Sequence, residues 1–116
     1  WLSDACAAIQ EPRHFVGGTP ALARLAGRSP EHLAREMRRH LRRTPTDVVN
    51  AARLTHAAQQ LATTSRPIID IAGECGFEGL GHFYKLFHAR YATSPLRYRR
   101  HAVAPMDISY GRAMAR

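Results

Sequence analysis

The stretch IAGECGFEGLGHFYKLF, residues 71–87, decides the fold because it joins two apolar helical patterns through a glycine-rich segment. One pattern opens the stretch, and a second resumes at Phe83 and continues to Phe87 at helical spacing. Glycine tolerates the positive φ of a tight turn better than any other residue, so we expect Gly76 to end the first helix in that conformation. The stretch therefore predicts a helix, a turn and a second helix.

An earlier part of the chain repeats this arrangement. A shift of 49 residues places Gly27 on Gly76, and the shift becomes 50 after the turn, where the second copy has one more residue. Chance alignment of two generic amphipathic hairpins is the weaker interpretation, because glycine, proline and charge all match in register. The matched positions are Leu22–Ala23 with Ile71–Ala72, Leu33 with Phe83, Arg35 with Lys85, Met37 with Phe87, Leu41 with Tyr91, Thr44–Pro45 with Ser94–Pro95, and Val48 with Tyr98.

Capping signals set the limits of the two units. Thr19-Pro20 and Ser29-Pro30 each place a hydroxyl N-cap before a proline at the first helical position. We therefore expect one helix-turn-helix over about residues 19–42 and a second over about 67–91.

Other segments complete an all-α domain over residues 1–101. The first ten residues read as a short amphipathic helix and 12–18 as a loop. A long helix over about 47–63 has no internal glycine or proline and would join the two units. Residues 102–116 lack periodicity and are expected to form a poorly ordered tail. The expected buried side of the long helix is Val49, Ala52, Leu54, Ala57 and Leu61.

Positive charge is the strongest compositional signal in this chain. It has 116 residues with 17 Lys+Arg against 9 Asp+Glu, a net charge of +8, and every basic residue except Lys85 is arginine. Arginine suits phosphate and guanine because its planar fork donates two parallel hydrogen bonds. The alternative is a solvated basic surface produced by codon bias.

Other functional classes have little support in the sequence. Cys6 and Cys75 are expected to be free thiols, and no apolar run is long enough to cross a bilayer. A zinc site built from Cys75, His82 and His88 is a weak alternative because no tight ligand spacing occurs. No catalytic set or phosphate loop is visible, so we expect neither an enzyme nor a cofactor.

The helix that begins at Pro30 places charged residues opposite its apolar positions. Arg35 could donate to guanine O6 and N7, and Glu31 could accept from cytosine N4. Arg38, Arg42 and Arg43 suit phosphates, which position a protein without reading sequence.

The later helix has fewer polar residues on its outward face. Lys85 is the one residue of this face that could form a strong hydrogen bond with a base. Leu80 or Tyr84 could contact a thymine methyl. Gly79 and Gly81 weaken the helix start but would allow the backbone to approach a phosphate closely.

Two segments carry a resemblance to a known family: GTPALARLAGRSPEHLAREMRRH, residues 18–40, and PIIDIAGECGFEGLGHFYKLFHARYATSPLRYRR, residues 67–100. They resemble the DNA-binding domain of the AraC/XylS family of bacterial transcription regulators, over about residues 5–100. The most specific part is the spacing IA-x3-GF-x5-F-x3-F followed by SP-x2-YR. The resemblance implies about seven helices, with two recognition helices that enter successive major-groove segments on one face of DNA and often bend it.

The resemblance also implies roles for individual residues. Ala92, Gly79, Ala34 and Gly81 depart from the usual pattern, which favours backbone contacts by the second unit. The implied base-contacting residues are Glu31, Ala34, Arg35, Leu80, Gly81, Tyr84 and Lys85. The phosphate-contacting candidates are Thr19, Ser29, Arg38, Arg42, Arg43, Arg66, Gly79, His88 and Arg99.

These observations predict sequence-specific binding of double-stranded DNA by one domain of a bacterial transcription regulator. The chain begins at Trp1, so we expect a fragment of a longer protein, with a sensor domain and its small-molecule effector site elsewhere. The N-terminal half further resembles regulators of sugar use, which favours carbon-source or metabolic target genes. RNA polymerase is a candidate partner, the cytoplasm is the expected location, and no membrane association is expected. The alternative is a helical protein-interaction module that uses Leu80 and Tyr84 beside an incidental basic face.

Overall fold

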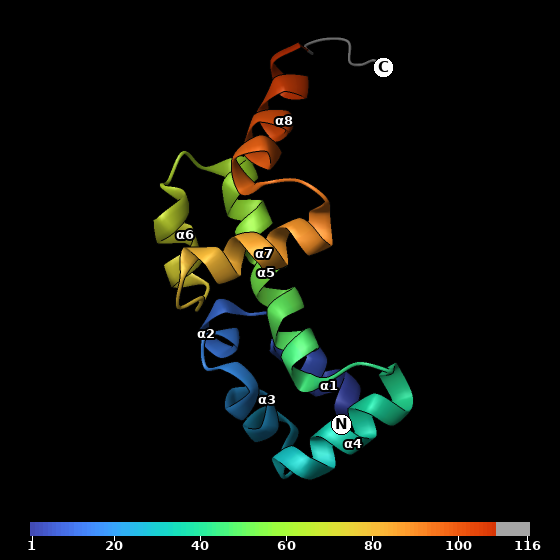
Figure 1. Ribbon diagram of the computed structural model, residues 1–116. Coiled ribbons are helices and arrows are strands. Elements are labelled where there is room, and N and C mark those ends of the chain that lie inside the picture. The colour runs from blue at the N-terminus through green and yellow to red at the C-terminus, as the bar shows by residue number, and fades with distance from the viewer. Residues whose placement is uncertain (109–116) are drawn as a thin grey trace.

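The computed structural model describes residues 1–108, which form eight helices and contain no strand. The all-α prediction is confirmed (Figure 1). The helices are α1 (Leu2–Ala8), α2 (Pro12–Phe15), α3 (Gly18–Ala26), α4 (Pro30–Leu41), α5 (Pro45–Thr63), α6 (Ile68–Glu74), α7 (Leu80–Tyr91) and α8 (Pro95–Ile108).

The short helix α2 and the start of α3 correct the expectation for residues 12–18, which were predicted as a loop. Pro12 at the first helical position starts a single turn, too short to produce a periodic signal. α3 then begins at Gly18 with Gly17 as its N-cap, so Thr19 is not the cap. A Cβ at Gly17 would lie 2.8 Å from the Cβ of Ala21, so only glycine lets α2 pass so directly into α3.

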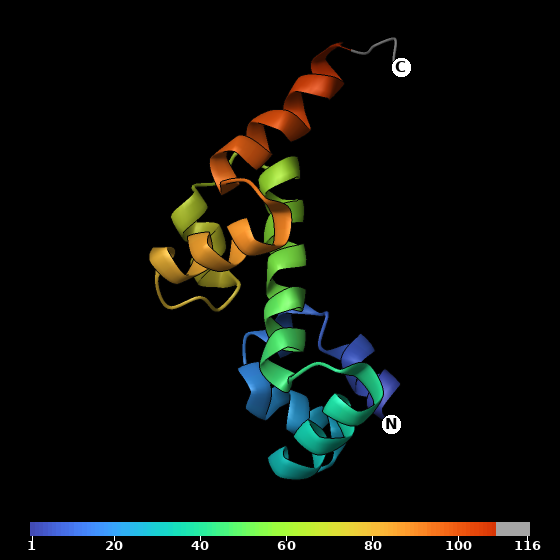
Figure 2. The same cartoon turned by 45° about the vertical axis from the view of Figure 1, so that its right-hand side comes forward.

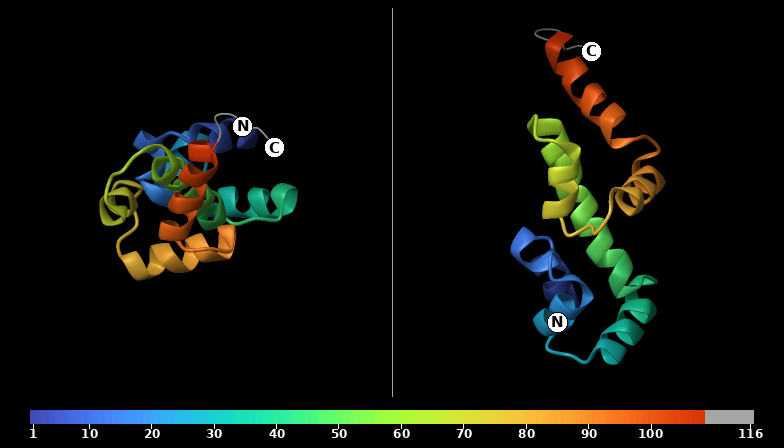
Figure 3. Two further views of the ribbon diagram at one scale, coloured as in Figure 1. Left: turned by 90° about the horizontal axis from the view of Figure 1, so that it is seen from above. Right: turned by 60° about the vertical axis from the view of Figure 1, so that its left-hand side comes forward.

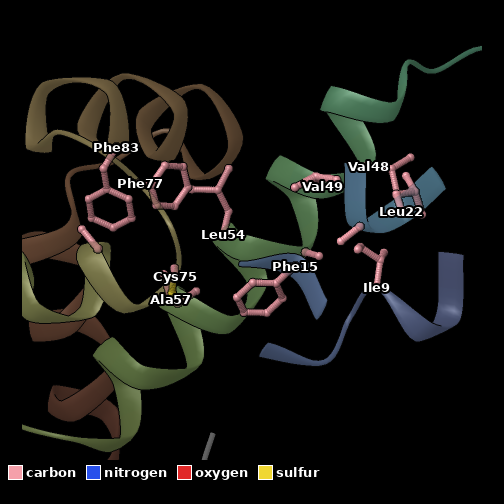
Figure 4. Close-up of a cluster of buried hydrophobic side chains, with 14 of the residues drawn as sticks. Ile9, Phe15, Leu22, Val48, Val49, Leu54, Ala57, Cys75, Phe77 and Phe83 are labelled. Atoms are coloured by element: carbon pink, nitrogen blue, oxygen red, sulfur yellow. The ribbon is translucent and has the colours of Figure 1, made fainter. Parts of the chain in front are cut away.

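Helix α5 runs through the middle of the molecule, and both halves of the chain pack against it (Figures 1 and 2). The five core positions predicted on this helix are all buried. Figure 4 shows the core along α5, with Ile9 and Leu22 near Val48 and Val49 toward one end and Phe77 and Phe83 near Leu54 toward the other.

The structure confirms the internal repeat in the backbone as well as in the core. Gly27, the C-cap of α3, has a φ of 66°, and Gly76, which follows Cys75 at the end of α6, has a φ of 98°. Arg42 and Ala92, at matched positions, end the second helices with φ of 54° and 59°. Positive φ is uncommon outside glycine, so its occurrence at matched positions indicates the same turn in both units.

Leu41 departs from the expected core pattern, because 43% of it is exposed. Its repeat partner Tyr91 stacks against Phe87 and Tyr98, with ring centroids 4.6 and 5.2 Å away. In the first unit the corresponding neighbours are the smaller aliphatic side chains Met37 and Val48, which do not cover the last turn of α4.

Helix α8 continues through residues 102–108, which were expected to belong to a tail. Ala102 and Ala104 have high helix propensity, a property that apolar periodicity does not reveal. The rest of the expected tail, 109–116, lies outside the described residues.

A half-buried arginine on α5 joins the two halves of the domain. The Arg53 guanidinium donates from Nε to the carbonyl of Phe15 at 2.9 Å and from Nη2 to that of Val16 at 3.2 Å. It also donates from Nη1 to the carbonyl of Gly76 at 3.4 Å. The end of α2 and the turn after α6 are therefore held by one side chain.

Replacement of Gly76 with alanine tests the fit of this turn. A Cβ there would lie 3.0 Å from Arg53 Cζ in a backbone with φ of +98°. We expect Gly76→Ala to lower the free energy of unfolding by about 1–3 kcal/mol in urea denaturation, since strain and crowding act together. The control is Gly73→Ala in α6, where nothing lies within 4 Å, and which should leave stability unchanged or raise it. Equal effects of the two substitutions would contradict this account.

Candidate nucleic-acid interface

Helices α4 and α7 lie on the same side of α5, as the right-hand view of Figure 3 shows. Each helix packs one face into the core, through Leu33 and Met37 on α4 and through Phe83 and Phe87 on α7. Arg35 and Lys85, the matched basic residues, are both exposed. The second helix of each unit is therefore presented to solvent from the same side of the domain.

The first turns of α4 hold the predicted base-contacting residues of the first unit. The hydroxyl of Ser29 accepts a hydrogen bond from the backbone N–H of His32 at 3.1 Å, which confirms Ser29 as the N-cap. Glu31 is exposed and Ala34 is half-buried. Ala34, Arg35 and Arg38 line one shallow hollow of about 300 Å³, so these three predicted residues come together.

Four arginines gather where α4 ends and α5 begins. Arg38, Arg39, Arg42 and Arg43 line an open hollow of about 550 Å³ together with Thr44 and one acidic residue of α5. Arg39 was not among the predicted site residues, although its place in the run of arginines was a signal for it. A cluster of cations around an open hollow suits the phosphates of a nucleic-acid backbone.

The acidic residue beside these arginines is Asp47, and its role is to cap α5. Its carboxylate accepts from the backbone N–H of Thr44 at 3.1 Å, and the Thr44 hydroxyl accepts from the backbone N–H of Asp47 at 3.0 Å. The first of these bonds is the main reason that the pKa of Asp47 lies below its ordinary value. Arg43 donates to the Asp47 backbone carbonyl at 3.3 Å, which places Arg43 over the start of α5.

The outer face of α7 is less charged than that of α4. Gly81, Tyr84, Lys85 and His88 are exposed, and Leu80 is half-buried. The helix begins after Gly79 without a side-chain cap, and nothing lies within 4 Å of a Cβ at Gly79 or Gly81. No contact among the residues that the structure describes therefore requires these two glycines.

A further hollow of about 340 Å³ lies between the two units, lined by residues of α5, α7 and the α4–α5 connection. Arg90 on α7 and Arg43 both line it. Arg90 donates to the hydroxyl of Thr55 on α5 at 3.3 Å and is a basic residue that the sequence analysis missed. No periodic signal pointed to it, because its position depends on how α7 packs on α5.

Three predicted phosphate-contacting residues lie apart from these groups. Thr19 is half-buried in the first turn of α3. Arg66 forms an ion pair with Glu74. Arg99 donates to the backbone carbonyls of Leu61 at 3.1 Å and Arg66 at 2.7 Å, which fastens α8 to the end of α5. The phosphate role of all three stays a prediction.

The described residues offer no sign of metal binding, of a reactive thiol or of a membrane span. In 1–108 no group of three or more His, Cys, Asp or Glu side chains is placed to hold a metal ion. Burial raises the pKa of the Cys75 thiol to about 11, so this thiol stays protonated and unreactive at neutral pH. Over the same residues, every helix is too short or too polar to cross a membrane.

Comparison with known proteins gives consistent matches to helix-turn-helix regulators. A family model described as a helix-turn-helix domain matches residues 22–101. The chain is 35% identical over 98 residues to regulatory protein SoxS of Escherichia coli strain K12, which covers 84% of this chain and 92% of SoxS. Some other curated relatives are longer, and the chain spans only 25% of the HTH-type transcriptional regulator GlxA of Rhizobium meliloti.

Solved structures share the same fold. An AraC-type transcriptional regulator from Chromobacterium violaceum superimposes with a TM-score of 0.78 at 25% identity, over 90% of this chain and 93% of that one. A protein described as the xylose-binding transcription activator XylR superimposes with a TM-score of 0.70 at 26% identity. This match covers 84% of the present chain but only 26% of XylR.

Replacement of Asp47 with asparagine tests the cap at the start of α5. A carboxylate whose pKa is lowered by folding stabilises the folded state above its ordinary pKa. That contribution is lost as the pH falls through the lowered value. We therefore expect Asp47→Asn to be less stable than the wild type at neutral pH in thermal unfolding, with a difference that shrinks on acidification. A stability difference that stays constant with pH would show that the negative charge of Asp47 does not contribute to the stability of the folded state.

Proposed function

The chain belongs to the AraC/XylS family of transcription regulators as its DNA-binding domain, and on this basis we propose that α4 and α7 read two successive major-groove segments of one duplex. The observation that carries the proposal is the exposure of both helices on the same side of α5 while their apolar faces are buried. The family is one of regulators rather than enzymes, so the chemistry required is recognition alone. Major grooves on one face of B-DNA recur about every 34–36 Å, which a single domain of this size can span.

Helix α4 is the principal reader in this proposal. Arg35 donates two hydrogen bonds to a guanine, and Glu31 accepts from a cytosine amino group. Both residues are exposed on the first turns of α4, which is where a recognition helix meets base edges. Arg38, Arg42 and Arg43 neutralise phosphates beside that groove segment, and the hollow they line supports this role.

Helix α7 makes a different kind of contact. Lys85 supplies its polar base contact, and Tyr84 or Leu80 lies against a thymine methyl. The uncapped first turn at Gly79 and Gly81 leaves backbone N–H groups available to a phosphate. We therefore expect α7 to contribute more to affinity than to sequence discrimination.

The regulated genes and partners follow from the family rather than from this domain. We propose metabolic genes such as those of carbon-source use, which the match to a regulator described as xylose-binding supports. The proposed place of action is the bacterial cytoplasm, with RNA polymerase as a partner. A small-molecule effector would act through other parts of the full protein.

A protein-interaction module is the second candidate function, and two exposed apolar side chains favour it. Leu41 and Tyr84 are each 43% exposed, on helices that lie on the same side of α5. Such a module would bind duplex DNA weakly at physiological salt. A domain that neutralises about six phosphates should instead lose affinity with a log–log slope near −5 against salt concentration.

Selection of bound sites from a random duplex pool tests the proposal. We expect the selected duplexes to contain two short half-sites whose centres lie about one helical turn apart. The affinity for such a duplex should then fall steeply as the salt concentration rises. Recovery of unrelated sequences together with a flat salt response would favour the interaction module.

Replacement of Arg35 with alanine separates base reading from phosphate binding. We expect Arg35→Ala to cost about 1–3 kcal/mol on the selected site and to relax the preference at one base pair. The matched control is Arg38→Ala, one turn further along α4, which should weaken binding to all duplexes alike and reduce the salt slope by about 1. Uniform loss in both variants would show that Arg35 is only a phosphate contact.

A further inference from the structure

His32 lies at the centre of a set of contacts that reaches Arg35. Its imidazole stacks on the indole of Trp1, with ring centroids 5.7 Å apart and an interplanar angle of 29°. Its Nδ1 lies 3.1 Å from Nη2 of Arg35. Its backbone N–H is held by the Ser29 hydroxyl. The ring of His32 therefore lies between Trp1, the N-cap of α1, and the exposed Arg35 of α4.

The chemistry of the Arg35–His32 contact determines its direction. A guanidinium has five N–H donors and no acceptor, so Nδ1 of His32 must be the acceptor. In this contact the ring hydrogen of His32 lies on Nε2. The bond uses one donor of Arg35 and leaves four for a base. His32 can therefore orient the guanidinium without competing for the bidentate contact.

Trp1 is itself held in place by the first unit. The Cζ atom of Arg28 lies 4.5 Å from the centroid of the indole, within the range of a cation–π contact. The same guanidinium donates to the backbone carbonyls of Ala26 at 3.3 Å and Gly27 at 3.2 Å. Trp1 is thus tied to the turn between α3 and α4, and its ring limits the orientations open to His32.

We propose that His32 and Trp1 are positioning residues for base reading by Arg35. The inference rests on the proposed function, in which Arg35 contacts a guanine. A free arginine has large rotamer entropy, and ordering such a side chain on binding costs affinity. The bond to His32 restricts the guanidinium before DNA arrives, and the stack on Trp1 holds the His32 ring in the orientation that accepts this bond.

Two substitutions at His32 separate the acceptor from the ring. His32→Phe keeps a ring for Trp1 and removes the acceptor, whereas His32→Asn removes the ring and places an amide oxygen near the position of Nδ1. The measured quantity is the ratio of dissociation constants for two duplexes: the selected site, and the same site changed at the base pair where Arg35→Ala loses preference. We expect His32→Phe to reduce this ratio about 3- to 10-fold, the range expected when one long side chain must be ordered on binding. His32→Asn keeps an acceptor but loses the stack on Trp1, so its ratio should lie between those of the wild type and His32→Phe.

Variants of Trp1 and a double variant test whether His32 acts through the stack and through Arg35. Trp1→Ala should reduce the ratio in the same direction as His32→Phe, and Trp1→Phe should not. His32→Phe combined with Arg35→Ala should show no loss of preference beyond that of Arg35→Ala alone. Binding to a random duplex should stay unchanged in the His32 variants.

The possible failures are distinguishable. If Arg35→Ala relaxes the preference at no base pair of the selected site, the proposed base contact is wrong and the positioning role is wrong with it. If Arg35→Ala removes the preference while His32→Phe keeps it, only the positioning role is overturned. Equal loss on every duplex in His32→Phe would also overturn it, because it would show that His32 only stabilises the fold.

Discussion

The arrangement of α4 and α7, the two helices proposed to face DNA, depends on how the two halves of the chain are fastened to α5. The buried side of that helix supplies apolar contact to each half, and Arg53 adds three hydrogen bonds to carbonyls from α2 and from the turn after α6. Partial burial lowers the pKa of Arg53, but an arginine begins so high that it stays charged. Hydrogen bonds from a charged donor are about twice as strong as neutral ones, so this single side chain is well suited to hold two segments together.

The two units share a backbone plan but differ in their surfaces. Matched turns and buried positions give α4 and α7 similar places on α5. Their outer faces differ, because α4 carries three arginines and α7 only one, and α7 has glycines at and next to its start. A duplication of this kind preserves the packing constraints, because the core faces must still fit α5. The solvent faces are free to diverge, and the proposed division of roles uses this freedom, with α4 discriminating between bases and α7 holding the DNA backbone.

Local signals in the sequence predicted most of the fold, because helix ends and turns depend on neighbouring residues. Ser29 is the N-cap that its hydroxyl indicated, and Gly76 has the positive φ that its place after an apolar pattern required. Contacts between distant residues could not be read in this way. Arg53 and Arg99 each bond to carbonyls 38 residues away, and no periodic pattern distinguishes such an arginine from one that faces a phosphate.

If α5 fixes the separation of α4 and α7 on DNA, as proposed, the spacing between half-sites is the most direct test. The selected duplex should be compared with one in which about five base pairs, roughly half a helical turn, are inserted between unchanged half-sites. A fixed separation predicts that the insertion lowers the affinity to that of a duplex with one half-site. Equal affinity for both spacings would contradict the account, because it would mean that the two units reach their grooves independently.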